Sequence, residues 1–247
     1  MYAGAFAYRD YREKAAPPGL VSFGVTVGET DLWIAADRDL TKEAVRSIQV
    51  HRSDIEEYIQ HHPRFIETLE PWEEPASRGS LPARMIDAAA AVDLGPMAAV
   101  AGALAHAVAE DLSKFSSRIL VENGGDLFLV GEEPNTVGLW AGPSPLSGRL
   151  GLVLNPGSGT AVCTSSGTVG PSLSFGKADC ATVIAPSGAL ADAAATALGN
   201  RVKTPGDIEG ALDWALSVKG ITGAVVILGD ALGAKGDVKL VKVTDSK

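Results

Sequence analysis

The sequence predicts an α+β protein, and two observations lead to that fold class. Short runs in which apolar and polar side chains alternate indicate half-buried strands, and longer segments whose apolar residues recur at helical spacing indicate amphipathic helices. The two kinds of segment follow one another without the regular strand–helix alternation of a parallel sheet. With 247 residues, of which 46% are hydrophobic, the chain can bury a sizeable core, and we expect one domain over residues 1–247.

A strand pair, a helix and a loop are predicted in the first third of the chain. Residues 21–27 alternate apolar with small or polar side chains, which is typical of a strand, and residues 31–36 are its expected hairpin partner. From Thr41 onward the apolar residues fall on one face of a helix, which ends shortly before Pro63. Residues 71–84 contain three prolines, two glutamates and a glycine, so we expect a long surface loop or linker there.

The rest of the chain predicts three helical segments and several strands. The first helical segment covers residues 85–112 and breaks at Gly95-Pro96, the second is the alanine-rich segment 186–200, and the third covers residues 207–218. A glycine-rich turn precedes the final strand. The predicted strands cover residues 118–121, 127–130, 137–141, 150–154, 178–184, 224–228 and 238–243.

The charge and cysteine content exclude several classes of function. A formal net charge of −9 without any run of basic residues argues against binding to bare nucleic acid. Cys163 and Cys180 are too few for a disulfide framework, and the N-terminal residues MYAGAFAYRDYREK lack the pattern of a signal peptide, so we expect a cytoplasmic protein. Asp93 and Pro96 interrupt the apolar stretch 88–109, which predicts a buried helix rather than a membrane span.

Two oxygen-bearing side chains lie four residues apart on the alanine-rich helix. Asp192 and Thr196 therefore project from one face of that helix, about one turn apart. Mg²⁺ prefers oxygen ligands and commonly takes only one or two from protein side chains, so that waters and substrate phosphates complete its octahedron. The same spacing also fits an ordinary helix, in which Asp192 complements the helix dipole and Thr196 bonds back to a backbone carbonyl.

The tetrapeptide Asn123-Gly124-Gly125-Asp126 separates two predicted strands. A glycine pair between strands favours a tight hairpin turn. Glycine at such a place also lets a ligand approach the backbone closely, so both interpretations stay open.

The segment TSSGTVGPSLSFGKAD, residues 164–179, is unusually poor in bulky apolar side chains. A phosphate-binding P-loop is excluded, because five residues rather than four separate the glycines before the lysine and an alanine follows it. Successive backbone amides, together with the hydroxyls of Thr164, Ser165 and Ser166, would suit an anion-binding concavity. An ordinary polar connection between two strands is the alternative.

Taken together, four segments resemble the ApbE-type flavin transferase superfamily. They are, in order, DLGPMAAVAGALAHAVAEDL, ILVENGGDLFLVG, CTSSGTVG and ATVIAPSGALADAAATALGN. Within that superfamily the sequence is similar to an uncharacterised branch of shorter bacterial and archaeal proteins, whose blocks ETDL and SLSFGKAD it also contains. The similarity extends from about Arg9 to the C-terminal hairpin.

The resemblance implies a fold of mixed, largely antiparallel sheets packed with alanine-rich helices, in which FAD lies across a cleft and Mg²⁺ bridges the protein to the pyrophosphate. It implies that Asp192 and Thr196 hold the metal. Gly124, Gly125 and Asp126 match the GGD block of the superfamily. The ligand-binding set expected in the later loop consists of Thr164, Ser165 and Gly167, which match the Thr-Ser-Gly block near the flavin, with Ser166 beside them and Lys177 as a partner for phosphate.

Two features of the superfamily are missing from this sequence. The transferases carry a histidine-containing block of the form HIxDPxTG after Thr-Ser-Gly, whereas GPSLSFGKAD contains no histidine. They also carry a lysine in the helix before the GGD block, and MAAVAGALA has none. A general base is therefore missing, and Asp126 and Asp179 are the candidates to replace it.

Three functions are compatible with these observations. The first is a Mg²⁺-dependent enzyme acting on the pyrophosphate of FAD or a related dinucleotide; the transferases move FMN from FAD onto a threonine of a target protein and release AMP. The second is a non-catalytic flavin-binding or nucleotide-binding module. The third is a structural or interaction protein that keeps only the fold. Small-residue helices and the resemblance also favour a homodimer.

Overall fold

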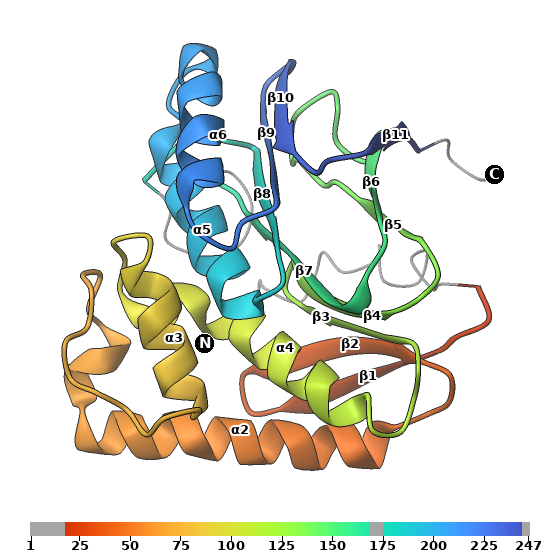
Figure 1. Cartoon of the computed structure of the whole chain (residues 1–247), viewed down its shortest axis with the longest axis vertical. Coiled ribbons are helices and arrows are strands. Elements are labelled where there is room, and N and C mark those ends of the chain that lie inside the picture. Colours follow the sequence, from red (N-terminus) through yellow and green to blue (C-terminus); the bar gives the residue numbers. More distant parts are fainter. Residues whose placement is uncertain (1–17, 168–174, 244–247) are drawn as a thin grey trace.

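The computed structural model describes residues 18–167 and 175–243, and within them the chain forms five α-helices and eleven strands (Figure 1). The helices are α2 Thr41–His61, α3 Leu81–Ala90, α4 Val100–Leu112, α5 Gly188–Arg201 and α6 Ile208–Ser217, with short 3-10 turns η1 Pro63–Ile66, η2 Pro96–Ala99 and η3 Pro205–Asp207. The strands are β1 Val21–Val27, β2 Thr30–Ala36, β3 Ile119–Asn123, β4 Asp126–Gly131, β5 Asn135–Gly138, β6 Leu150–Leu154, β7 Gly157–Ser165, β8 Cys180–Ala185, β9 Gly223–Leu228, β10 Ala231–Gly236 and β11 Leu240–Lys242.

An eight-stranded sheet forms the centre of the protein, with strand order β1-β2-β3-β4-β7-β8-β9-β10. All of its neighbouring strands are antiparallel. A second, three-stranded sheet has the order β11-β6-β5 and is antiparallel as well. The predicted α+β class with largely antiparallel sheets is therefore confirmed.

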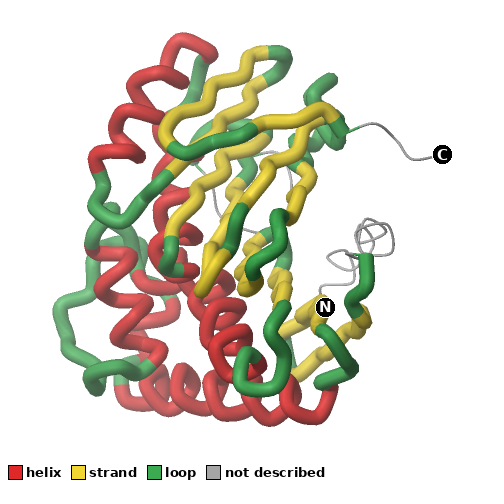
Figure 2. The backbone as a smooth tube through the Cα atoms, turned by 45° about the vertical axis from the view of Figure 1, so that its right-hand side comes forward, coloured by secondary structure: helices red, strands yellow, loops and turns green. Residues whose placement is uncertain are grey.

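The helices lie on one side of the large sheet and the small sheet lies on the other (Figure 2). Side chains alternate along each strand, so they supply two separate apolar layers. The larger layer lies between the sheet and α2–α6, and the smaller lies between the two sheets. Residues on β7 illustrate the division, because Cys163 packs in the helix layer and Val162 in the layer between the sheets.

Helices α4 and α5 cross with almost no side chain between them. A Cβ atom built on Gly102 would collide with the Gly188 carbonyl oxygen, and a Cβ built on Gly188 would collide with that of Gly102. In Figure 1 the cyan start of α5 meets the start of α4 at this crossing. Helix α5 begins with a serine cap, because the Ser187 hydroxyl accepts a hydrogen bond from Leu190 N at 3.3 Å. The glycine contact therefore fixes both helices at their first turns.

Three sequence predictions need correction. Strand β7 was not predicted, and its last two residues fall in the segment 164–179 for which a polar connection was one interpretation; its Gly159 packs on Phe128, with a ring carbon 2.7 Å from where a Cβ would be. Strand β10 was expected to be a glycine-rich turn, yet it pairs with β9 over its whole length. The strand predicted at 137–141 ends at Gly138, and residues 139–141 continue as a loop.

Two other predictions are confirmed. The predicted buried helix within residues 88–109 exists as α4, and eight of its residues are buried. No helix in the described parts of the chain is long and apolar enough to cross a membrane. The expected loop at 71–84 is shorter than predicted, because α3 begins at Leu81 after the Ser80 cap.

Candidate functional site

Several of the predicted site residues meet at one end of the large sheet. The β3–β4 turn lies there, because Asn123 pairs with Asp126 across it. The end of β7 and the start of β8 lie there too, since Ser165 pairs with Ala181, and the end of β9 follows, since Ile227 pairs with Cys180. An antiparallel order brings alternate turns to the same edge, so segments far apart in the sequence converge.

Asp192 extends from α5 to the first turn of α4. Its Oδ2 atom accepts a hydrogen bond from the backbone N of Gly102 at 2.9 Å, and the backbone of Ala101 contributes a second one. The amides of a helix N-terminus favour a carboxylate, because they point toward it and carry the positive end of the helix dipole. Asp192 therefore does complement a helix dipole, but that of α4 rather than that of its own helix.

A second carboxylate lies beside Asp192. Asp126, at the start of β4, is 8% exposed and accepts hydrogen bonds from the Cys163 thiol and the Thr164 backbone. Burial and the neighbouring Asp192 charge raise the pKa of Asp126 well above its usual range, and Glu122 adds to the rise. Burial raises the pKa of Asp192 to about 7, although its two backbone hydrogen bonds lower it. The two acids thus form a pair that is costly to keep fully ionised.

Thr196 completes the polar face of α5. It lies one turn after Asp192, and both side chains are half-buried. The structure shows no hydrogen bond from its hydroxyl to the described residues, so the predicted bond back to a helix carbonyl is absent within them. Two interpretations of Thr196 were open: a ligand for Mg²⁺, or a hydrogen bond back to a helix carbonyl. Only the first, in which the hydroxyl oxygen is available to a ligand, fits the described residues.

The donor set at this place fits a hard cation. No cluster of three or more His, Cys, Asp and Glu side chains arranged to hold a metal exists among residues 18–167 and 175–243. Mg²⁺ does not require one, since it is commonly held by one or two protein oxygens while phosphates and waters supply the rest. A divalent cation would also relieve the repulsion between Asp126 and Asp192.

The first two hydroxyl residues of the segment 164–179 are the last residues of β7, and their side chains point to opposite faces of the sheet. Thr164 points into the layer between the sheets, where its Oγ1 lies 2.8 Å from Thr182 Oγ1. Ser165 points toward α5, and its buried Oγ has no hydrogen-bond partner among the described residues. A buried polar atom without a partner indicates a missing ligand or water. Ser165 is therefore the hydroxyl of this segment best placed for a ligand, and Thr164 contributes its backbone amide to Asp126.

The remaining predicted loop residues lie farther along the same segment. The backbone N of Gly167 donates to Ala178 O at 2.9 Å, which joins the two legs of the loop. The side chain of Lys177 is exposed, and its backbone N donates to Val202 O at 2.8 Å. Ser166 lies beside Gly167, half-buried. Residues 168–174, which include part of the expected anion-binding concavity, lie outside the described residues.

Asp179 has a different setting from Asp126. It is buried, and its Oδ2 accepts a hydrogen bond from the backbone N of Gly229 at 2.8 Å. The Gly229 carbonyl in turn accepts from the Ser144 hydroxyl at 2.6 Å. The buried Asp179 carboxylate thus has a structural role, because its hydrogen bond fixes the β9–β10 turn.

The glycine pair forms the predicted hairpin turn. Gly124 and Gly125 have φ angles of 67° and 114°, a region that side chains with a Cβ rarely adopt. A Cβ on Gly125 would lie 3.8 Å from Thr164 O, so the turn lies beside the end of β7. The Gly125 backbone N donates to Glu122 Oε1 at 3.0 Å. The turn interpretation is confirmed, and it places Asp126 opposite α5.

Sequence reasoning missed three residues around this site. Asn123 donates from Nδ2 to Ala101 O at 3.1 Å, and so ties the β3–β4 turn to α4. Cys163 donates to Asp126, and burial raises the pKa of its thiol. Asn200 accepts a hydrogen bond from the loop that follows β7. Only Asn200 had a sequence signal, because it continues the spacing of four from Asp192 and Thr196.

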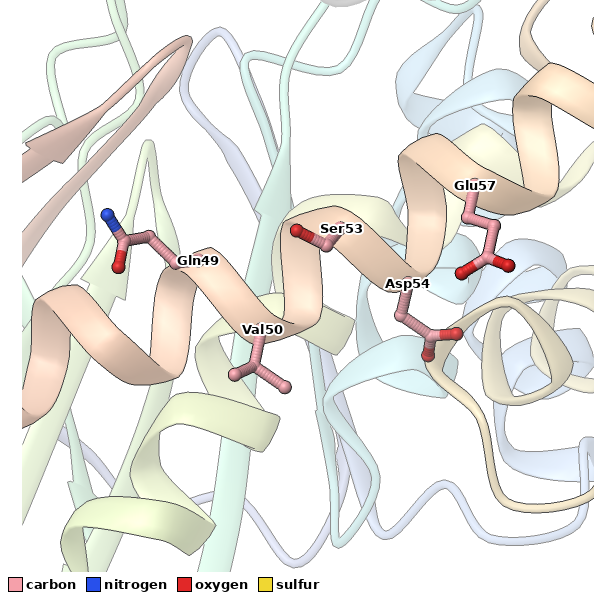
Figure 3. A pocket seen from close by; sticks show the side chains of 5 residues that line it. All are labelled: Gln49, Val50, Ser53, Asp54 and Glu57. Carbon is pink, nitrogen blue, oxygen red and sulfur yellow. The ribbon is translucent and has the colours of Figure 1, made fainter.

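A surface hollow elsewhere on the molecule is not a candidate site. It lies on α2 and is lined by Gln49, Val50, Ser53, Asp54 and Glu57 (Figure 3). Asp54 has a structural role, because its Oδ2 accepts a hydrogen bond from the backbone N of Leu81 at 2.7 Å, at the start of α3. Convergent polar groups from several elements, which mark ligand sites, are found at the sheet edge instead.

The fold is that of ApbE proteins. The structure of the Thermotoga maritima ApbE protein matches with a TM-score of 0.57 at 12% identity, covering 87% of this chain and 96% of that chain. The flavin transferase ApbE of Vibrio cholerae matches with a TM-score of 0.56 at 14% identity, covering 89% and 97%. Identities this low establish the ApbE-like fold.

The sequence comparisons then establish the family. The family described as AbpE bacteria matches residues 13–239. A UPF0280 protein of Methanosarcina barkeri is 43% identical, over 88% of this chain and 87% of its own length. One from Methanocella arvoryzae is 42% identical, over 85% and 86%. The chain belongs to this family, which confirms the resemblance inferred from its motifs.

Proposed function

We propose that the protein binds FAD or a related dinucleotide together with Mg²⁺ and acts on the pyrophosphate. The observation that carries the proposal is the Asp126–Asp192 pair, in which two carboxylates interact at the end of the sheet where the β3–β4 turn faces α5. Such a pair is favourable when a divalent cation or a shared proton compensates it. The flavin transferase ApbE of Vibrio cholerae, which shares the fold, supports a flavin as the ligand.

Asp192 and Thr196 are the proposed metal ligands. The α4 amides orient the Asp192 carboxylate, and an ionised carboxylate has lone pairs left after accepting two hydrogen bonds. The Thr196 hydroxyl supplies a second oxygen from the next turn of α5. A bound Mg²⁺ would neutralise charge on the pyrophosphate and so favour its cleavage. The ligand itself would lie along Gly124, Gly125, Ser165, Ser166 and Gly167, with Lys177 toward its phosphates.

Asp126 is the better of the two candidates for the general base. It lies beside Asp192, whereas the Asp179 carboxylate is bonded to the β9–β10 turn. In the proposed reaction a hydroxyl oxygen attacks the phosphorus of the FMN half. The P–O bond to the AMP half breaks, AMP leaves with the bridging oxygen, and the hydroxyl proton passes to Asp126.

The alternative is a binding module that leaves the dinucleotide intact. It is favoured by the absence of the histidine block and of the helix lysine that the transferases carry. A purely structural protein would have little use for the unpartnered Ser165 hydroxyl and the pair of like charges. Cytoplasmic location and a homodimer stay predictions from the sequence.

One experiment separates these functions. Purified protein is incubated with FAD, with and without Mg²⁺, and FAD, FMN and AMP are resolved by chromatography while protein-bound flavin is recorded. The proposal expects Mg²⁺-dependent AMP, with FMN free or attached to protein, and expects Asp126→Asn to retain FAD without cleaving it. Intact FAD that stays with the wild-type protein would establish the binding module. No AMP and no retained flavin under either condition would rule out both.

A further inference from the structure

The second leg of the small-residue loop rests on the end of α5. The backbone N of Phe175 donates to Asn200 Oδ1 at 2.8 Å, and the backbone N of Lys177 donates to Val202 O at 2.8 Å. Between them, a Cβ built on Gly176 would collide with the Gly199 carbonyl oxygen. Three consecutive residues of the loop therefore contact the end of the helix, two of them backbone to backbone and Phe175 through the Asn200 side chain.

The first leg of the loop reaches the same turn of α5. A Cβ on Gly199 would lie 3.8 Å from the unpartnered Ser165 hydroxyl, on the side opposite Gly176. The Gly167–Ala178 hydrogen bond joins the two legs beyond this point. The end of α5 thus lies against both described legs, residues 165–167 and 175–178.

Asn200 belongs to the polar face that carries the proposed metal ligands. Asp192, Thr196 and Asn200 are spaced by four residues, and all three are half-buried on a helix whose other residues are mostly buried. Each step of four residues advances about 6 Å along a helix. Along the axis of α5, the loop contact at Asn200 therefore lies about 6 Å from Thr196 and about 12 Å from Asp192.

We propose that Asn200 is a positioning residue that holds residues 175–177, the described second leg of the loop, at a fixed distance from the proposed metal ligands. This inference rests on the proposed function. The amide of Asn200 accepts from the loop backbone, so it acts on the loop whichever side chain the loop carries at residue 175. A dinucleotide that bridges the cation and the loop then meets both parts already in place, which reduces the ordering cost of binding.

The test uses three variants of the full-length protein. Asn200→Ala removes the acceptor for the Phe175 amide, while Asn200→Asp keeps an acceptor oxygen at the same place. Asn155→Ala is the matched control, because Asn155 is exposed in the β6–β7 connection, at the other end of β7 from Ser165. Hydrogen exchange of peptides covering 175–178 is measured without ligand, and FAD affinity is measured by calorimetry with and without Mg²⁺.

The expected result has two parts. In Asn200→Ala the 175–178 amides exchange faster, whereas Asn200→Asp and Asn155→Ala retain the wild-type rates. With Mg²⁺ present, Asn200→Ala weakens FAD binding about threefold to tenfold, the range expected for one lost hydrogen bond, and it reduces the gain in affinity that Mg²⁺ gives. Thermal unfolding of all variants is recorded to show that each is folded.

Three contrary results have different meanings. If the wild-type protein binds FAD in the presence of Mg²⁺ and Asn200→Ala binds it equally well, the positioning role is wrong while the proposed function stands. If the wild-type protein binds no FAD under either condition, the proposed function fails, and the positioning role fails with it. Unchanged exchange of residues 175–178 in Asn200→Ala overturns the loop contact directly.

Discussion

Two acidic sites in the same protein are built in opposite ways. Asp37, after β2, is surrounded by donors: its Oδ1 accepts from Arg118 Nε at 2.8 Å, and its Oδ2 accepts from the Ser116 hydroxyl at 2.9 Å and from Ser117 N at 3.0 Å. The Arg118 guanidinium holds the pKa of Asp37 well below its usual range. Around Asp126 the strongest charges are those of Asp192 and Glu122, and its pKa is raised.

The contrast lies in how the fold compensates the charge of each carboxylate. Asp37 joins β2 to the segment before β3, and its charge is compensated within the fold. The Asp126–Asp192 pair has backbone and thiol donors, yet the charges that act on Asp126 are acidic. The two sites thus differ in the sign of the charges around each carboxylate, and the following predictions test this difference.

The largest effect is expected from Asp192→Asn. The substitution keeps an oxygen that accepts from Gly102 N, but it removes the charge that attracts the cation. We expect Mg²⁺-dependent FAD binding to weaken about 100-fold or more, as measured by calorimetric titration. The fold should be retained, because one of two like charges disappears. Unchanged binding would remove Asp192 from the site.

Asp37→Asn should give the reverse pattern. It leaves the Arg118 guanidinium without its strongest partner, so we expect the free energy of unfolding to fall by about 1.5–3 kcal/mol in chemical denaturation. FAD binding should stay at the wild-type level. A loss of binding in this variant, with the fold intact, would show that the two acidic sites are not independent.

The pH dependence of stability should separate the two sites without any ligand. The folded-state pKa of Asp192 is about 7, above its ordinary 3.8, so the folded protein binds more protons between these values and its stability falls as the pH rises through them. Asp37 acts oppositely, because its pKa is lowered and its contribution is lost as the pH falls below 3.8. Melting temperatures from pH 3 to 8 measure both slopes. Asp192→Asn should flatten the upper one, and a wild-type stability that instead rises from pH 4 to 7 would contradict the assignment.

The smallest effect is expected at the loop. Gly176→Ala places a methyl group against the Gly199 carbonyl, so the loop must shift away from α5 while both acidic sites keep their contacts. We expect FAD affinity to fall about threefold to tenfold in the presence of Mg²⁺, by calorimetry, with the pH profile unchanged. Gly210→Ala is the control, because a Cβ there meets nothing within 4 Å.

The sequence predicted the fold class, one shared helix face and one turn, while the ligand-binding roles of the site residues stay predictions. Asp192 and Thr196 share a face as their spacing required, and the glycine pair forms its turn. Strand β7 was missed, because the residues that pack against Phe128 and α5 are small and resemble a loop. Small residues are required where backbones approach closely, and only the packed structure shows which element they approach.

The electrostatic pairing was also beyond the reach of the sequence. Asp126 and Asp192 are 66 positions apart, and they become neighbours only because the start of β4 faces α5. The Asp192 carboxylate reaches the first turn of α4 only because α4 and α5 cross there. The residue spacing within either helix does not predict that crossing. Spacing within one element predicts a shared face, while contacts between elements follow from topology.

The glycine crossing of α4 and α5 has a consequence for how this protein can change. A Cβ on Gly102 would lie 2.7 Å from the Cβ of Asp192, and one on Gly188 would lie 2.8 Å from that of His106. Any larger residue at either position forces the helices apart and moves Asp192 with them. The crossing therefore acts as a fixed reference point for redesign: altered ligand preference has to come from the loop and the β3–β4 turn, which can vary while the two helices stay in register.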